Sequence, residues 1–285
     1  MGKDKQTGGS KKVVTVGLVQ MTCTKDRKEN LSKAIEITQN LSSKGANIIC
    51  FQEIFNLHWF PKNIDVSNFA LAEEIPGEMT KVMGEVAKKE KIVLILPMFE
   101  KAEEGIYFNT AVVIDANGKI LGKYRKNHIP HLPLWEERFY FTLGNLGYPV
   151  FKTKFATIGI QMCWDNFFPE GSRILGLKGA QIIFAPTACS FAFQAKWRKV
   201  LCANAIANNL FVARANRVGD EEGQKFHGGS IVIDPNGEII AEAGEKDEIL
   251  IADIDLDLIK ETRNIWTFYA NRRPETYKEV INPLP

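Results

Sequence analysis

The two halves of this 285-residue chain repeat one order of apolar segments and turns, and this repetition limits the folds available to it. In each half, short β-branched and apolar runs alternate with segments of helical spacing, which is the pattern of an α/β protein. The offsets between the matched segments differ, so the chain repeats a layout and not a unit of fixed length. The matched segments are residues 14–18 with 156–160, 45–49 with 179–183, and 115–118 with 234–237.

Each half is expected to form one mixed sheet with helices on its outer face. Packing the two sheets face to face predicts a four-layer α-β-β-α sandwich built from two pseudo-repeated halves. A single doubly wound sheet is the alternative. The glycine-rich phosphate-binding patterns typical of that fold do not occur in the sequence. Residues 1–12 are predicted to be a flexible polar tail, and residues 13–285 a single domain.

Charge and cysteine content exclude several classes of protein. The 36 Lys and Arg residues nearly balance the 34 Asp and Glu residues, and no dense basic block favours nucleic-acid binding. No apolar run reaches membrane-spanning length, and the N-terminus lacks the apolar stretch of a secretory signal. The five cysteines include no CxxC pair, so we expect a reducing, cytoplasmic location.

Three reactive side chains follow predicted strands, where the chemistry of α/β proteins is usually located. Glu53 comes after an apolar run, and aromatic residues follow it, which suits a partly buried general base. Cys163 lies between a strand and a helix start, a position expected to favour the thiolate. Lys126 ends the second arm of the first hairpin. Converging in one pocket, these residues could carry out acyl transfer without a metal or cofactor.

Each of these residues also has an ordinary structural interpretation. Glu53 and Lys126 could form an ion pair or face solvent, and most cysteines are inert and buried. A histidine partner for Cys163 is the usual arrangement in cysteine hydrolases, and His227 is one candidate. His128 and His131 have a spacing that is weak support for zinc, so no metal site is predicted. The sequence holds four histidines, namely His58, His128, His131 and His227.

Three motifs in order resemble the nitrilase superfamily of carbon–nitrogen hydrolases. They are Phe-Gln-Glu at 51–53, Lys-Tyr-Arg-Lys at 123–126 and Met-Cys-Trp-Asp at 162–165. The resemblance extends from residue 13 to about residue 273 and implies the same sandwich fold. It also implies that Cys163 is the nucleophile, that Glu53 is the general base, and that Lys126 stabilises the tetrahedral intermediate.

The resemblance implies further site residues. Glu136 and Glu137 compete for the place of a second glutamate, and the following Arg-Phe-Tyr-Phe favours Glu137. The backbone N–H of Trp164 is expected to serve as an oxyanion donor. His128 and Asp165 are expected to contribute to substrate binding. No cofactor is implied, and the expected partners are a small-molecule substrate and further copies of the chain, with no nucleic acid or membrane.

Two branches of the superfamily match best, the N-carbamoylputrescine amidohydrolases and the β-ureidopropionases. Both imply cleavage of an N-carbamoyl amine or amino acid, with release of ammonia and carbon dioxide. An amidase or nitrilase acting on another small substrate, or a catalytically weak binding module, is the alternative. Residues 187–196 depart from the putrescine branch and are expected to border the substrate. Candidates for binding the substrate's distal charge are Arg138, Arg173, Arg198 and Arg217 for a carboxylate, and Asp165 and Glu136 for an amine.

The aromatic stretch at residues 265–269 lies outside the repeated layout. The superfamily's habit of forming dimers and larger assemblies implies a homo-oligomer. We therefore expect this stretch to help bury a two-fold interface. Packing onto its own domain is the alternative.

Overall fold

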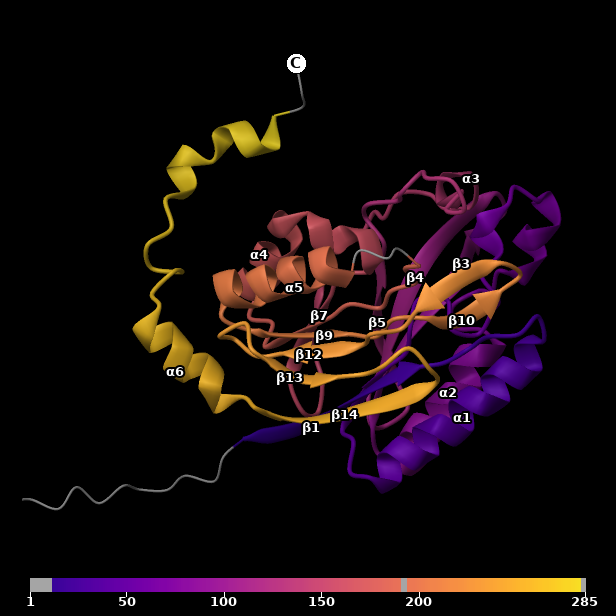
Figure 1. Cartoon of the computed structure of the whole chain (residues 1–285), viewed down its shortest axis with the longest axis horizontal. Coiled ribbons are helices and arrows are strands. Elements are labelled where there is room, and N and C mark those ends of the chain that lie inside the picture. The colour runs from indigo at the N-terminus through magenta and orange to yellow at the C-terminus, as the bar shows by residue number, and fades with distance from the viewer. Residues whose placement is uncertain (1–11, 191–193, 283–285) are drawn as a thin grey trace, which may run out of the picture.

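A computed structural model describes residues 12–190 and 194–282 of the chain. Two six-stranded sheets pack face to face, and pairs of helices cover their outer sides (Figure 1). Helices α1 and α2 contact the first sheet, whereas α5 contacts the second and packs against α4. The predicted α-β-β-α sandwich is therefore confirmed. The predicted tail lies outside the described residues except for Lys12, and the single-domain boundary at residue 13 stays a prediction.

The first sheet has the strand order β14-β1-β2-β3-β4-β5. Its elements are β1 (Val13–Gln20), α1 (Arg27–Ser43), β2 (Ile48–Cys50), α2 (Glu78–Glu90), β3 (Val93–Glu103), β4 (Ile106–Ile114), β5 (Ile120–Arg125) and β14 (Glu248–Asp255). Two 3-10 helices, η1 (Phe60–Lys62) and η2 (Val66–Leu71), and the short α3 (Glu137–Tyr140) lie in its connections.

The second sheet has the order β13-β12-β9-β8-β7-β6. Its elements are β6 (Val150–Lys152), β7 (Thr157–Ile160), α4 (Pro169–Leu177), β8 (Ile182–Phe184), α5 (Gln194–Asn208), β9 (Phe211–Arg214), β12 (Ile231–Ile233) and β13 (Ile239–Glu242). From β14 to β5 and from β6 to β13, strand pairs run antiparallel, parallel, parallel, antiparallel and antiparallel. The two halves thus share one topology, as the repeated sequence layout predicted.

The buried strands explain why the sequence runs are almost wholly apolar. Side chains such as Val16 and Ile95 of the first sheet share one core cluster with Ile160 and Phe184 of the second. Opposite faces of the same strands pack under the helices. At Gly159 of β7, an added Cβ would lie 2.8 Å from the Leu175 side chain, so a glycine lets α4 approach the sheet closely.

Two parts of the chain lie outside the repeated layout. The hairpin of β10 (Val218–Glu221) and β11 (Gln224–His227) forms a separate two-stranded sheet that the sequence analysis did not predict. After α6 (Asp257–Ile265), the chain continues as an arm through the 3-10 helices η4 (Pro274–Thr276) and η5 (Lys278–Ile281), past α4 and α5 (Figure 1). None of the helices in the described residues is long and apolar enough to cross a lipid bilayer.

Candidate active site

Four reactive side chains come together just beyond the ends of strands. Glu53 follows β2, Lys126 directly follows β5, and Cys163 begins the 3-10 helix η3 (Cys163–Phe167) after β7. Glu137 is the first residue of α3. Their exposed fractions are 0% for both glutamates, 1% for Lys126 and 5% for Cys163. The structure therefore brings together the four residues predicted to be catalytic and removes them from bulk solvent.

Lys126 lies between the two carboxylates. Its Nζ donates to Glu53 Oε1 at 2.7 Å and to Glu137 Oε2 at 2.6 Å. Burial alone would lower the pKa of this lysine, but the charges of Glu137 and Glu53 outweigh it and hold the pKa well above its usual range. Lys126 is therefore a buried cation at neutral pH, which makes it suited to stabilising a developing oxyanion.

The Glu53 carboxylate is also held by donors that sequence reasoning missed. Asn109 Nδ2 on β4 donates to Oε1 at 2.7 Å, and the backbone N–H of Ala188 donates to Oε2 at 2.9 Å. The backbone N–H of Lys126 donates to the Asn109 carbonyl at 2.9 Å, so Asn109 orients both Glu53 and Lys126. Asn109 lies inside a largely apolar strand. A polar residue at such a position is the only feature of the sequence that could have indicated its role.

Glu137 differs from Glu53 in how its oxygens are used. Its Oε2 accepts from Lys126, and its buried Oε1 has no partner among the described residues. Burial raises the pKa of Glu137 to about 7, with Lys126 opposing the shift and Glu53 adding to it. At neutral pH this carboxyl group can therefore hold or release a proton beside Lys126.

The nucleophile candidate lies in a constrained turn. Cys163 has a φ of 46°, in the left-handed region that most residues avoid, and its backbone N–H donates to the Pro186 carbonyl at 2.9 Å. Asn166 Nδ2 donates to the Cys163 carbonyl at 2.9 Å. These bonds hold the turn against its strain.

The expectation of a resting thiolate was wrong. Burial raises the pKa of the Cys163 thiol well above its usual range, with Glu53 adding to the shift and Lys126 opposing it. The local argument considered only the helix start and omitted the desolvation that the fold imposes. The thiol is therefore protonated at neutral pH, and a base must remove its proton during attack.

Asp165 organises the backbone around the nucleophile. Its Oδ2 accepts from the Tyr124 hydroxyl at 2.5 Å and from the Met162 N–H at 3.0 Å. Its Oδ1 accepts from the His128 N–H at 2.9 Å and lies 2.8 Å from His128 Nδ1. The His128 ring stacks on Phe168 with 3.7 Å between centroids. Both oxygens of this buried carboxylate are thus occupied within the protein, and substrate contact by His128 and Asp165 stays a prediction.

A small, mostly apolar cavity lies beside Cys163. Its volume is 10 Å³, which is about the space of one water molecule. Trp164 lines the cavity, and its backbone N–H belongs to the first helical turn, where no intrahelical acceptor is available. No histidine is among the described residues that line it. These residues are Pro130, Leu132, Trp135, Cys163, Trp164, Ala188, Cys189 and Trp197.

Ala188 and Cys189, from the segment expected to border the substrate, line this cavity. Contact of that segment with a substrate stays a prediction. Residues 191–193 of that segment lie outside the described residues. Trp135 and Trp197, which sequence reasoning did not single out, form two further walls. Trp197 Nε1 lies 3.1 Å from Cys189 Sγ, which ties α5 to the segment after β8.

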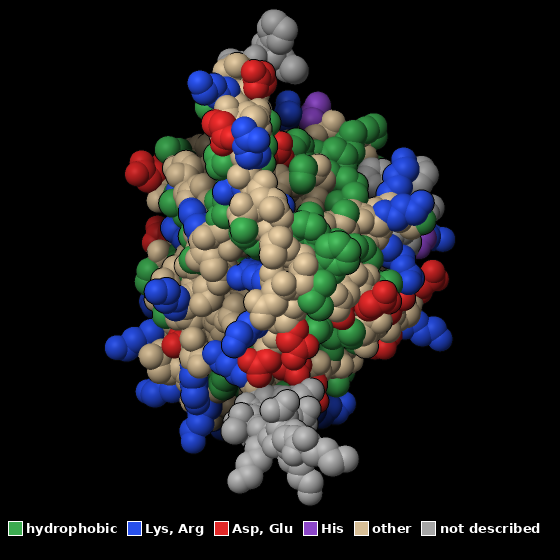
Figure 2. Space-filling view, turned by 90° about the vertical axis from the view of Figure 1, so that its left-hand side faces the viewer, with side chains coloured by type: hydrophobic (Ala, Val, Ile, Leu, Met, Phe, Trp, Pro, Cys, Tyr) green, Lys and Arg blue, Asp and Glu red, His purple; other side chains and the backbone are tan. Residues whose placement is uncertain are grey.

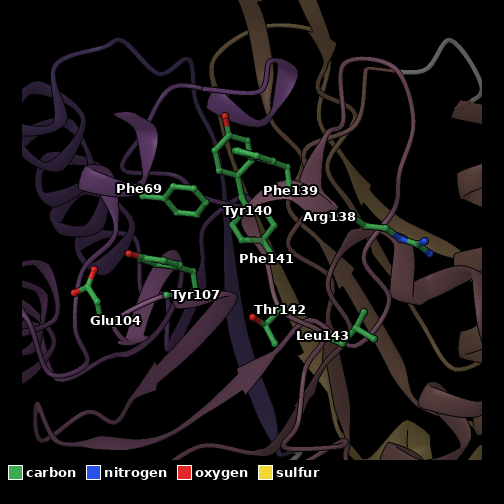
Figure 3. Close-up of a pocket in the computed structure, with 10 residues that line it drawn as sticks. Phe69, Glu104, Tyr107, Arg138, Phe139, Tyr140, Phe141, Thr142 and Leu143 are labelled. Carbon is green, nitrogen blue, oxygen red and sulfur yellow. The ribbon is translucent and has the colours of Figure 1, made fainter. Parts of the chain in front are cut away.

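A larger hollow is not lined by any of the four reactive residues. This groove of 960 Å³ is lined by aromatic side chains of α3 and its neighbours, including Phe69, Tyr107 and Phe139 (Figure 3). It contains neither Cys163, Lys126 nor Glu53. Size alone would place the active site here, but the candidate nucleophile Cys163 lines the much smaller cavity.

Most residues proposed for the substrate's distal charge are engaged elsewhere. Arg173 donates to the Ala207 carbonyl at 2.7 Å, and Arg198 pairs with Glu242 at 2.7 Å. The Asp165 carboxylate is also engaged within the protein, by the donors described above. Within residues 12–190 and 194–282, no group of three or more His, Cys, Asp and Glu side chains is placed to hold a metal ion.

The relatives of this chain are hydrolases of carbon–nitrogen bonds. The sequence pattern of the family "Carbon-nitrogen hydrolase" matches residues 15–264. The chain is 38% identical over 287 residues to an N-carbamoylputrescine amidase of Solanum lycopersicum, covering 95% of each protein. It is 32% identical over 306 residues to a β-ureidopropionase of Arabidopsis thaliana, covering 98% of this chain and 75% of the relative.

A solved structure has the same fold. The crystal structure of a carbon–nitrogen hydrolase from Helicobacter pylori G27 superimposes with a TM-score of 0.92 at 33% identity, covering 96% of this chain and 100% of that one. The matched range contains Glu53, Lys126, Glu137 and Cys163, and both carboxylates pair with the buried lysine. On sequence and on structure, this chain belongs to the carbon–nitrogen hydrolase family.

Proposed function

We propose that this chain hydrolyses the terminal C–N bond of a small N-carbamoyl compound, with Cys163 as the nucleophile. The observation that carries the proposal is the buried Lys126 ammonium, which contacts both Glu53 and Glu137 beside the thiol. The relatives named for N-carbamoyl substrates support the choice of substrate. Another amide or a nitrile remains the alternative substrate.

In the proposed reaction, Glu53 takes the proton of the Cys163 thiol as the sulfur attacks the ureido carbonyl carbon. The oxyanion that forms accepts hydrogen bonds from Lys126 Nζ and the Trp164 N–H, and such donors typically lower a barrier by ~3 kcal/mol each. When the intermediate collapses, the C–N bond breaks and the proton returns from Glu53 to the leaving ammonia. An S-carbamoyl enzyme remains.

Water completes the cycle. Glu53 takes a proton from the water, whose oxygen attacks the thioester-like carbon, and the C–S bond then breaks to regenerate the thiol. The product carbamic acid decomposes to carbon dioxide and an amine. Glu137, whose pKa burial raises to about 7, keeps Lys126 in place and can exchange a proton with it. His128 and Asp165 hold the turn of Cys163 through the bonds that Asp165 accepts.

A buried cation lies behind one wall of the cavity. Arg214 on β9 is 1% exposed, and its guanidinium carbon lies 4.9 Å from the ring centroid of Trp197, which lines the cavity. Burial lowers the pKa of Arg214 to about 10, because the desolvated cation is disfavoured.

A reducing compartment such as the cytoplasm suits this chemistry. The five cysteines all lie in the described residues, and none forms a disulfide. A thiol nucleophile remains active only while it is reduced.

The substrate class is tested by measuring ammonia release from a panel of compounds. N-carbamoyl-β-alanine, N-carbamoylputrescine and neutral propylurea should all be turned over faster than a simple amide or nitrile. Cys163→Ala should be inactive on every compound. Preference for the amide or nitrile would contradict the carbamoyl assignment, and no turnover on any compound would favour a binding module.

The catalytic roles are tested by changing Glu53 and Lys126. Glu53→Gln removes the base but keeps the shape, so kcat should fall ~10²–10⁴-fold. Lys126→Met removes an oxyanion donor, with an expected loss of ~10²–10³-fold. The two losses should not add in the double variant, because both residues act on one transition state.

The matched control is Lys123→Met, three residues earlier on β5. Lys123 pairs with the buried Glu100 at 2.5 Å, away from Cys163, so this variant breaks an ion pair without reaching the site. It should keep its kcat even if its melting temperature falls. Glu53 and Lys126 variants that melt early but retain kcat per folded molecule would reduce the pair to a structural role.

We infer that the C-terminal arm, residues 265–282, packs against a second copy of the chain. Its apolar side chains are unusually open, with exposed fractions of 74% for Ile265, 54% for Trp266 and 84% for Ile281. Hydrophobic side chains gather along this face (Figure 2). The Tyr269 hydroxyl ties the arm to its own α5 by donating to the Asn208 carbonyl at 2.8 Å. Such an apolar surface favours burial in an interface.

Sedimentation velocity of the intact chain should therefore give a dimer or larger species at micromolar concentration. Trp266→Asp should shift the distribution toward the monomer, because a charge in an apolar interface is unfavourable. Lys278→Asp, a charge change on the same arm, should have a smaller effect. A single 32.0 kDa species for the unaltered chain would refute the inference.

A further inference from the structure

The turn that follows Glu53 is strained and fully buried. Ile54 has a φ of 52°, which is unfavourable for a β-branched residue, and its side chain is 0% exposed. The carbonyl groups of Glu53, Ile54 and Leu57 all lie in this buried turn. Buried carbonyls need donors, and strained backbone persists only where its surroundings hold it in place.

One guanidinium supplies these donors. Arg217, which is 0% exposed, donates from Nη2 to the carbonyls of Glu53 at 3.0 Å, Ile54 at 2.6 Å and Leu57 at 3.1 Å. Its own backbone is anchored on both sides. The Arg217 N–H donates to the Thr187 carbonyl at 3.1 Å, and its carbonyl accepts from the Gly228 N–H at 3.0 Å.

The β10–β11 hairpin also contributes contacts that hold this turn. Arg217 immediately precedes β10, and its Nη1 donates to Oε1 of Glu221, the last residue of β10, at 2.5 Å. The other carboxylate oxygen of Glu221 accepts from the backbone N–H of Trp59. The guanidinium carbon also lies 5.8 Å from the ring centroid of Trp59 and 5.6 Å from that of Phe226, and these two rings contact each other. Both ends of the segment from Glu53 to Trp59 are therefore bonded to this hairpin.

We propose that Arg217, fixed by Glu221, is a positioning residue that sets the Glu53 carboxylate for proton transfer; this rests on the proposed role of Glu53 as the base. The side chain of Glu53 meets donors from β4, from the end of β5 and from the segment after β8. It reaches all three only if its backbone is held at one place. Arg217 holds that backbone through the carbonyl of Glu53 itself.

Geometry, and not charge, is what Arg217 contributes. The Glu221 carboxylate, 2.5 Å from Arg217 Nη1, partly offsets the charge of the guanidinium. A lysine at this position would keep the positive charge. Its compact ammonium lacks the planar fork of a guanidinium, so it cannot bond three carbonyls and a carboxylate at once. Arg217→Lys is therefore the variant that separates position from charge.

The experiment measures kcat and KM for ammonia release, with melting curves, for Arg217→Lys in two backgrounds. In the otherwise unaltered enzyme, kcat should fall ~10-fold or more with KM little changed, because small misplacements of a catalytic group are costly. In the Glu53→Gln background, Arg217→Lys should have almost no further effect on the residual rate. A general structural role would lower the rate equally in both backgrounds.

Leu41→Ala serves as the matched control for lost stability. Leu41 is a fully buried side chain of α1 that packs on β1, outside the Glu53 turn. It should lower the melting temperature but leave kcat per folded molecule unchanged. The acid limb of the pH profile of kcat/KM, which reports the base, should move in Arg217→Lys and not in Leu41→Ala.

Glu221→Gln covers the case in which Arg217→Lys does not fold. This variant keeps an acceptor for the Trp59 N–H but weakens the bond that fixes the guanidinium. Its kcat should therefore fall by less than that of Arg217→Lys. As for Arg217→Lys, the fall should be absent in the Glu53→Gln background. Wild-type kcat in a folded Arg217→Lys or Glu221→Gln enzyme would overturn the proposal. Full activity of Glu53→Gln itself would instead overturn the proposed role of Glu53.

Discussion

A lysine ammonium buried between two carboxylates is the interaction on which the site depends. Lys126, Glu53 and Glu137 are almost fully removed from water, and the lysine pairs with both carboxylates. Desolvating charges is costly, and removing one partner from a buried pair typically costs roughly 3–5 kcal/mol. The cluster therefore contributes little to the net stability of the fold. Its proposed role is to place a fixed cation and a fixed base beside Cys163.

The pseudo-repeated sandwich explains how such a cluster can be built. The first half supplies Glu53, Lys126 and the asparagine that orients both, and the second half supplies Cys163 and the Ala188 N–H. Cys163 and Ile54, the residue after Glu53, both have left-handed backbone conformations. In each half, a strained turn thus places the reactive residue at the site. Packing between the halves fixes the two turns relative to each other.

Much of this arrangement could be predicted from the sequence. Repeated apolar runs led to the sandwich, and the polar residues that end those runs led to Glu53, Lys126 and Cys163. Glu137 required the family resemblance, because nothing local distinguishes it from Glu136. The β10–β11 hairpin was missed, because its buried residues include the polar Glu221 and Gln224. The sequence therefore lacks the alternation of apolar and polar residues that predicts a strand. The pKa of Cys163 was misjudged, because desolvation arises only once distant segments enclose the thiol.

The central claim is that Cys163 carries the substrate's carbonyl carbon covalently during turnover. Rapid acid quenching of the enzyme with N-carbamoyl-β-alanine, followed by peptide mass spectrometry, tests this directly. We predict a mass increase equal to the substrate minus ammonia on the peptide containing Cys163, absent in Cys163→Ala and absent from the peptide containing Cys202. Turnover without any adduct on Cys163, or with the adduct on another residue, would contradict the account.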